Sequence, residues 1–171
     1  FDFGRSWSTN QTIGSMIDSG IGASLSLTIP AFGLSVILSV LIALLTAFYR
    51  NSFFDRAMVV ACLAGISVSI LVYIIVFQYL FSFKFGIFPI SGYDAGWGER
   101  WGYLILPIII WVITSLGSEV LLYRTIMLDE VFQDYVRTAR SKGLSEKVVM
   151  LKHVLKNAMI PIITNIVLEI P

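Results

Sequence analysis

The sequence predicts an all-α membrane protein, a polytopic helical bundle, and three observations carry this prediction. Hydrophobic residues make up 57% of the 171 residues, charged residues make up 13%, and the mean hydropathy is +0.84. A typical soluble domain is about 25% charged. The apolar residues also gather in long uncharged segments, and the charges gather between these segments. Lipid must therefore cover part of the surface.

Three apolar segments are long enough to cross a bilayer, and a fourth begins near the end of the sequence. The first, residues 25–49, carries no charge. As a helix it would be roughly 37 Å long, more than the hydrocarbon core of about 30 Å. The second, residues 57–83, is also uncharged, and the third, residues 103–123, carries only Glu119. Residues 158–171 are expected to start the next membrane helix.

The basic residues predict the orientation of these segments. Nine of the twelve Lys and Arg lie in the turn Arg50–Arg56 and in the stretch Arg124–Lys156. Short loops rich in Lys and Arg stay in the cytoplasm, so we expect both regions there. Residues 1–24 and the loop 84–100 are then external.

The two ends and the rarest residues add a few expectations. The sequence starts at Phe1 and stops at Pro171 within an apolar run, which indicates an internal fragment. Pro30 is expected near the start of its helix, where a missing N–H costs least.

With one cysteine and one histidine, the sequence indicates no metal site. No catalytic group is predicted, and the net charge of +1 does not indicate a nucleic-acid partner.

The loop at residues 124–157 is unusually long and has a helical pattern. Acidic residues precede basic ones along residues 129–142, as a helix dipole favours. Gly143 stands where a left-handed residue would end this helix, and Ser145 can cap a second one. The pattern predicts two short helices that meet at a glycine corner against the membrane, a docking feature.

This corner resembles the cytoplasmic "EAA" loop of ABC importer permeases. Ala139 and Gly143 match the general form Glu-Ala-Ala, three residues, Gly. The departures resemble the dipeptide, oligopeptide and nickel permeases: Tyr135-Val136-Arg137-Thr138-Ala139-Arg140-x-Lys142-Gly143-Leu144, then His153-x-Leu155-x-Asn157-Ala158-x-x-Pro161. Two further stretches, Phe1–Ser6 and Phe88–Tyr93, are similar to the segment before that family's second membrane helix and to its outer loop.

The resemblance implies a type I ABC importer permease fold in the bacterial inner membrane. Residues 1–171 would be part of one permease domain of about six helices, with one helix missing before Phe1 and most of two after Ala158. A second homologous permease subunit would complete the pore, two cytoplasmic ATPase subunits would drive it, and an external binding protein would deliver the substrate. ATP and Mg would bind the ATPases, and no cofactor would bind this chain, in which no phosphate-binding loop of the type G-x-x-x-x-G-K-[ST] occurs.

The resemblance also implies that the corner couples the permease to the ATPases. The coupling residues carried over are the following: Arg137, Thr138, Ala139, Arg140, Lys142, Gly143 and Leu144. The basic residues among them also fit a plain topology signal.

Glu119 is the only acidic residue within a complete span. It would either snorkel or pair at the interface, or line the translocation path with Ser115 and Ser118, which lie on or beside the same helical face.

Two functional classes compete with an ATP-driven peptide importer. A membrane-embedded enzyme would need a polar catalytic cluster, and the spans offer only Glu119. A passive channel would need no ATPase. Within the family, import of nickel or another small solute remains an alternative to import of peptides.

Overall fold

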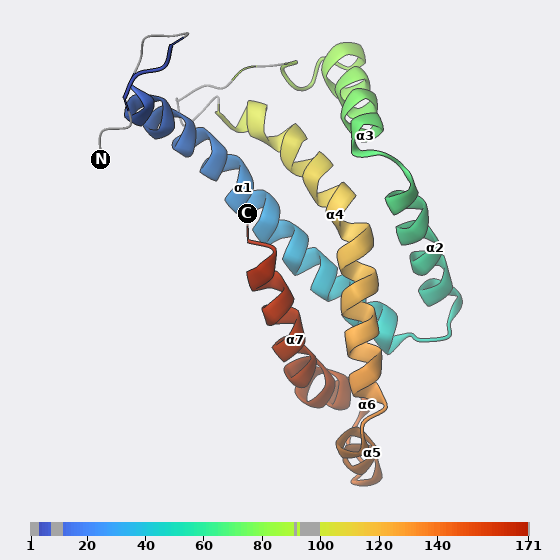
Figure 1. Cartoon of the computed structure of the whole chain (residues 1–171). Helices are drawn as coiled ribbons and strands as arrows, with labels where there is room; N and C mark the ends of the chain where they lie inside the picture. Colours follow the sequence, from blue (N-terminus) through green and yellow to red (C-terminus); the bar gives the residue numbers. More distant parts are fainter. Residues whose placement is uncertain (1–3, 8–11, 91, 93–99, 171) are drawn as a thin grey trace.

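All the named elements in the described part of the chain are helices. The computed structural model describes residues 4–7, 12–90, 92 and 100–170 (Figure 1). The order along the chain is α1 (Ile13–Phe48), α2 (Phe53–Ser67), α3 (Ile70–Phe77), η1 (Gln78–Lys84), α4 (Arg100–Val131), α5 (Asp134–Ser141), α6 (Glu146–Val148), η2 (Val149–Val154) and α7 (Leu155–Leu168). Here η marks a π-helical stretch. The expected all-α class is confirmed, while Phe1–Phe3, Ser91 and Tyr93 of the family stretches lie outside the described residues.

The long helices include two of the expected spans. Within the described residues, α1 and α4 are each long and apolar enough to cross a membrane, and a bent pair made by α2 with α3 and η1 would be a third. Helix α1 begins twelve residues before the expected start at Leu25. Pro30 therefore lies well inside the helix and not near its start, which corrects our expectation. Membrane helices tolerate such a proline because neighbouring groups satisfy the freed carbonyl.

The second expected span is not one continuous helix. Val68 is extended, with ψ 130°, and the helices on its two sides are bent by 91°. Ser69 starts the new helix by accepting a hydrogen bond from the N–H of Leu71 (3.4 Å), while the Tyr73 hydroxyl donates to the carbonyl of Gly65 (3.1 Å). Serine side chains compete in this way for backbone groups and favour helix boundaries, which explains a break within an apolar run.

One apolar core joins the lower parts of α1, α4 and α7 in Figure 1 to α5 and η2. It contains fully or almost fully buried residues from α1, α4, α5, η2 and α7: Ala43, Ala47, Tyr123, Met127, Val131, Val136, Ala139, Val149, Met150, Val154, Ala158 and Ile162. The alanines of α1 have small side chains, which let neighbouring helices approach closely. The short helix α5 is thus packed into the same core as the long helices.

Helix α2 is held against α4 at two levels. At Gly117 of α4, an added Cβ would lie 2.8 Å from Ile66 Cγ1 and 3.0 Å from the Cys62 carbonyl, so only glycine allows this approach. Nearer the start of α2, the buried Asp55 accepts two hydrogen bonds from Arg124, at 2.7 and 2.8 Å. Asp55 also accepts from the N–H of Asn51, so the turn between α1 and α2 is tied to the same carboxylate.

Candidate functional site

Helix α5 ends in a sharp turn at Gly143. Asp134 stands in its first turn and Arg140 in its last, as the helix dipole favours. Lys142 is the C-cap residue, and Gly143 follows with φ +77°. Apart from the chain neighbours of Gly143, no atom of the described residues lies within 4 Å of the place that a Cβ would occupy there. Glycine is therefore needed for its backbone conformation and not for space, and the expected glycine corner is confirmed.

A second helical run starts directly after the corner. Ser145 occupies the N-cap position of α6, as expected, but among the described residues its side chain makes no capping hydrogen bond. Helices α6, η2 and α7 follow one another without a gap from Glu146 to Leu168. Helix α5 therefore sits between the end of α4 and the start of this run, and it projects beyond the other helices at the bottom of Figure 1.

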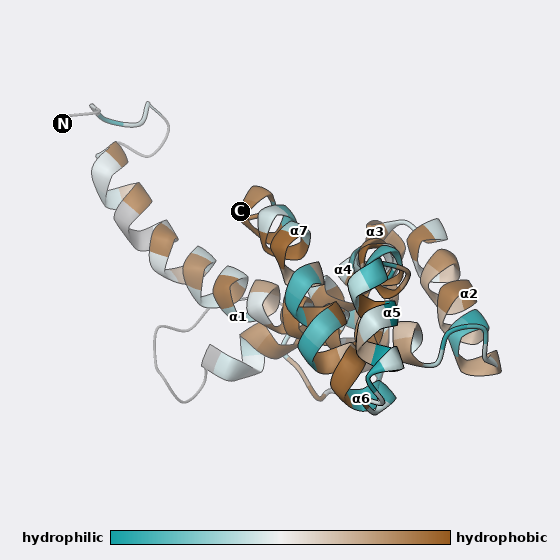
Figure 2. Ribbon diagram, turned by 90° about the horizontal axis from the view of Figure 1, so that it is seen from below, coloured by the Kyte–Doolittle hydropathy of each residue, from teal (hydrophilic) through white to brown (hydrophobic). Residues whose placement is uncertain are grey.

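The two faces of α5 have opposite character. Val136 and Ala139 are buried in the shared core. Away from the core, Figure 2 shows hydrophilic residues on α5 and α6. Five of the expected coupling residues are exposed: Arg137, Thr138, Lys142, Gly143 and Leu144. The structure thus places Ala139 inside, where it anchors the helix, and leaves these five exposed on the outer side.

The two arginines of α5 differ in their surroundings. Arg137 is 76% exposed and approaches Asp134 only at 3.6 Å. Arg140 is 30% exposed and forms a forked ion pair with Glu146 across the corner, with Nε–Oε2 and Nη2–Oε1 distances of 3.1 and 2.7 Å. The Arg140 guanidinium lowers the pKa of Glu146 below its ordinary value. This pair was not predicted from the sequence, because it depends on the turn between its members.

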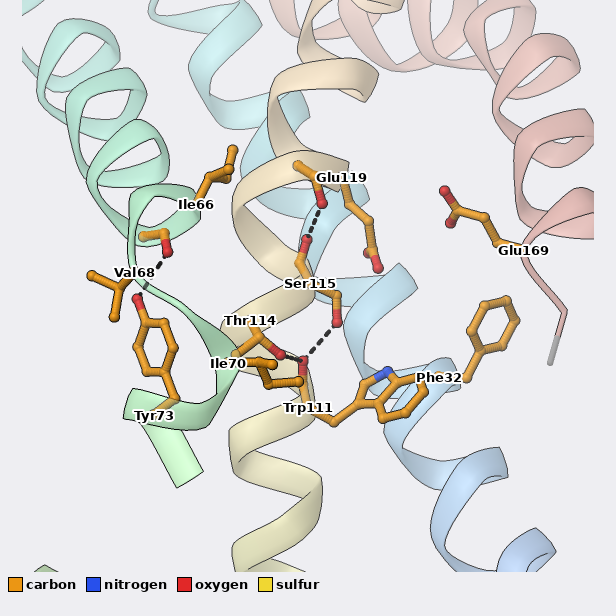
Figure 3. Close-up of a pocket in the computed structure, with 12 residues that line it drawn as sticks. Phe32, Ile66, Val68, Ile70, Tyr73, Trp111, Thr114, Ser115, Glu119 and Glu169 are labelled. Carbon is orange, nitrogen blue, oxygen red and sulfur yellow. Dashed lines mark hydrogen bonds between the residues drawn. The ribbon is translucent and has the colours of Figure 1, made fainter. Parts of the chain in front are cut away.

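A second candidate site is a cavity of about 470 Å³ beside α4 (Figure 3). Polar residues of α4 line one wall, namely Thr114, Ser115, Ser118 and Glu119, and the broken helix contributes Val68 and Tyr73. Helix α1 contributes Phe32, and Glu169 follows the end of α7. Figure 3 shows the carboxylates of Glu119 and Glu169 reaching toward the same space.

Glu119 is buried in the bundle, with 7% of its surface exposed. Ser39 of α1 donates a hydrogen bond to its Oε2 at 2.5 Å. Glu119 therefore pairs inside the bundle and does not snorkel to an exposed surface. Ser115 and Ser118 lie at the same cavity, where their hydroxyls donate to the backbone carbonyls of Trp111 and Ser115. The structure thus brings together the three residues that the sequence suggested for a polar path.

Sequence reasoning missed the partners of these residues. Ser39 is one of two buried serines spaced one helical turn apart in α1, Ser35 and Ser39, and this spacing was the available signal. Glu169 lies in the last residues of the sequence, where no pattern marked it. Within the described part of the chain, no group of three or more His, Cys, Asp or Glu could hold a metal ion.

The fold and these two sites define a polytopic helical membrane component. The chain belongs to the family of binding-protein-dependent transport system inner membrane components, whose model matches residues 35–171. It is therefore a multi-pass protein of the bacterial inner membrane and a transport component by family.

Curated relatives agree with this assignment. A putative peptide transport system permease protein of Brucella abortus is 34% identical over 96% of this chain and 53% of its own length. An oligopeptide transport system permease protein of Haemophilus influenzae is 30% identical over 95% of the chain and 53% of its own length. A glutathione transport system permease protein of Escherichia coli is 33% identical over 98% and 53%. The chain spans about half the length of the curated relatives it matches.

Proposed function

We propose that this chain is part of a pore-forming subunit of an ATP-driven importer for peptides. The family is one of binding-protein-dependent transport components. The relatives are named for the transport of peptides, oligopeptides or glutathione, itself a short peptide. Together these names favour a peptide over nickel as the substrate.

The partners proposed are those of such an importer. A second homologous permease subunit completes the pore, two cytoplasmic ATPases bind ATP and Mg, and an external binding protein delivers the peptide. This chain binds no cofactor itself and performs no chemistry. Its task is to convert a movement of the ATPases into a movement of membrane helices.

The observation that carries the proposal is the position of α5. It projects from the bundle, it is joined to α4 on one side and to the α6–η2–α7 run on the other, and its underside is buried in the core of those helices. A packed core transmits displacement because it has little free volume. An ATPase that moves α5 would therefore move α4 and α7 with it. The exposed residues Arg137, Thr138, Lys142 and Leu144 would form the contact.

The cavity beside α4 is the proposed translocation path. Helix α4 runs from the start of α5 to this cavity, so it connects the coupling contact with Glu119, Ser115 and Ser118. A buried carboxylate in a membrane bundle is costly and commonly serves a substrate or ion pathway. The ammonium and backbone N–H groups of a peptide are suitable partners for such a carboxylate.

The corner offers a sharp test in the full-length complex reconstituted into vesicles. Gly143→Val forces a β-branched residue to φ +77°, at roughly 1–2 kcal/mol or more, and should reduce peptide uptake per ATP hydrolysed. Gly143→Asn is the matched control, since asparagine tolerates this conformation, and should remain close to wild type. Arg137→Glu should weaken ATPase attachment by reversing a charge at the contact.

The measurements are substrate-stimulated ATP hydrolysis, peptide uptake and subunit stoichiometry on a gel. Normal coupled transport in both Gly143→Val and Arg137→Glu would contradict the coupling role. Peptide uptake without any ATPase would indicate a passive channel, and uptake of nickel but not peptide would contradict the proposed substrate.

A further inference from the structure

We propose that Arg140 is a positioning residue, whose ion pair with Glu146 fixes the angle between α5 and the α6–η2–α7 run. The inference rests on the proposed coupling function but goes beyond it, because it separates residues that would contact the ATPase from a residue that acts within the chain. Arg140 stands at the end of α5 and Glu146 at the start of α6, with Gly143 midway between them.

The geometry of the pair suits this role. Two N–H groups of the guanidinium reach the two oxygens of one carboxylate, at 3.1 and 2.7 Å. A forked contact of this kind fixes orientation as well as distance, which a single hydrogen bond does not. The Arg140 guanidinium lowers the pKa of Glu146 below its ordinary value, so the carboxylate that it faces stays charged at neutral pH. Arg50 of the neighbouring turn also favours the charged carboxylate.

The corner benefits from such a constraint because neither the turn at Gly143 nor the short helix α5 fixes the angle by itself. The turn is made at a glycine in open space, so crowding by neighbouring side chains of the described residues does not hold it. Helix α5 has only eight residues and is too short to be stable alone. Its buried contacts, Val136 and Ala139, lie along one strip of the helix, and a strip allows the helix to roll. Arg140 follows Val136 by four residues and lies beside the same strip, and its ion pair reaches Glu146 on the far side of the glycine, so it adds a second point of attachment that opposes the roll.

A double-mutant cycle in the full-length complex tests the pair. Arg140→Met keeps the apolar stem and removes the charge, and Glu146→Gln keeps the shape of the carboxylate. If the two residues act as one unit, each change should lower uptake per ATP roughly two- to fivefold, as expected for a partly exposed pair. The double variant should be no worse than either single variant. Arg140→Lys should recover part of the loss, and Lys156→Met, at an exposed lysine of α7, is the matched control.

A second measurement follows the angle through a distance between α5 and η2 and does not depend on transport. Spin labels placed at the exposed positions Ser141 and Lys152, in a Cys62→Ala background, give the distance distribution between α5 and η2. This distribution should be narrow with the native pair and broader in Arg140→Met and in Glu146→Gln. If the ion pair only stabilised the fold, each variant would instead lower the amount of assembled complex. The distance distribution in the complex that still assembles would then be unchanged.

Each outcome decides a separate question. Unchanged distributions in both single variants would overturn the positioning role, and so would effects on uptake that multiply in the double variant, since independent contacts behave in that way. Broadened distributions with unchanged coupling would leave the ion-pair inference standing and contradict the coupling function proposed for the corner. Broadened distributions with reduced coupling, equal in the single and double variants, support both.

Discussion

At the scale of single residues, glycine serves two different purposes in this chain. Gly143 is surrounded by open space and is required for its positive φ, whereas Gly117 has ordinary helical conformation and is required because α2 lies against it. Gly143 could be recognised in the sequence from the basic helix end before it. Gly117 could not, because its neighbours Cys62 and Ile66 are more than fifty residues away in the chain and only the packing reveals them.

Glu119 leads to a prediction at the same scale. Glu119→Gln keeps the shape of the side chain and can still accept the hydrogen bond from Ser39, but it replaces the carboxyl group at the cavity with an amide. We expect assembly to remain normal and peptide uptake to fall about tenfold, the effect of about 1.4 kcal/mol.

The measurement for Glu119 is uptake at several peptide concentrations, with complex yield as the check on assembly. Asp129→Asn is the control, since Asp129 is an exposed carboxylate of the same helix outside the cavity lining. Wild-type uptake in Glu119→Gln would show that Glu119 has only a structural role, through its hydrogen bond with Ser39.

At the scale of elements, one of the two contacts that hold α2 against α4 is an ion pair with a buried carboxylate. Asp55 is 3% exposed, and its partner Arg124 is 69 positions away in the sequence. Removing one partner leaves the other uncompensated, which is costly, whereas removing both is often nearly neutral. The pair therefore strengthens the attachment of α2 to α4 beside the close approach at Gly117.

We expect Asp55→Asn to lower the stability of the full-length protein by about 3 kcal/mol, since it strands Arg124 without its counter-charge. The double variant Asp55→Asn with Arg124→Gln should recover much of this loss. Thermal unfolding in detergent measures the effect, and Arg56→Gln, at an exposed arginine of the same turn, is the control. Equal stabilities for Asp55→Asn and wild type would show that the pair contributes little to the joint.

The sequence predicts the elements better than it predicts their contacts. Apolar length alone indicates the helices α1 and α4, because a membrane demands such length, and the glycine after a basic stretch indicates the corner. The break at Val68 escapes this reasoning, since a long apolar run conceals the preference of Ser67 and Ser69 for a helix boundary. Contacts such as Ser39 with Glu119 escape it as well, because they join residues 80 positions apart.

At the scale of the whole molecule, the distribution of charge predicts which end faces the cytoplasm. The corner and the turn near Asn51 lie among nine of the twelve basic residues. In a Cys62→Ala background, cysteines at Asn51 and at Lys142 should be shielded from membrane-impermeant thiol reagents in intact cells, and a cysteine at Lys84 should react.

Permeabilised cells that express the permease without its proposed ATPases supply the control for this experiment, because all three positions are exposed in this chain and should then react. Labelling of position 142 from outside intact cells would show that the orientation is the opposite of the predicted one. The corner would then lie on the side of the membrane without ATP.

The shared core has a consequence for how the protein is made. Helix α5 lies against η2, which follows it in the chain, and the core that it shares with Val149 and Val154 also includes Ala158 and Ile162 of α7. A ribosome that has just synthesised Gly143 has therefore produced the corner but not the surface on which it lies. Domains generally fold as units during synthesis, and here the unit closes only once α7 has been added. The part of the chain that would meet a partner thus takes its final form after the helix that supports it has emerged.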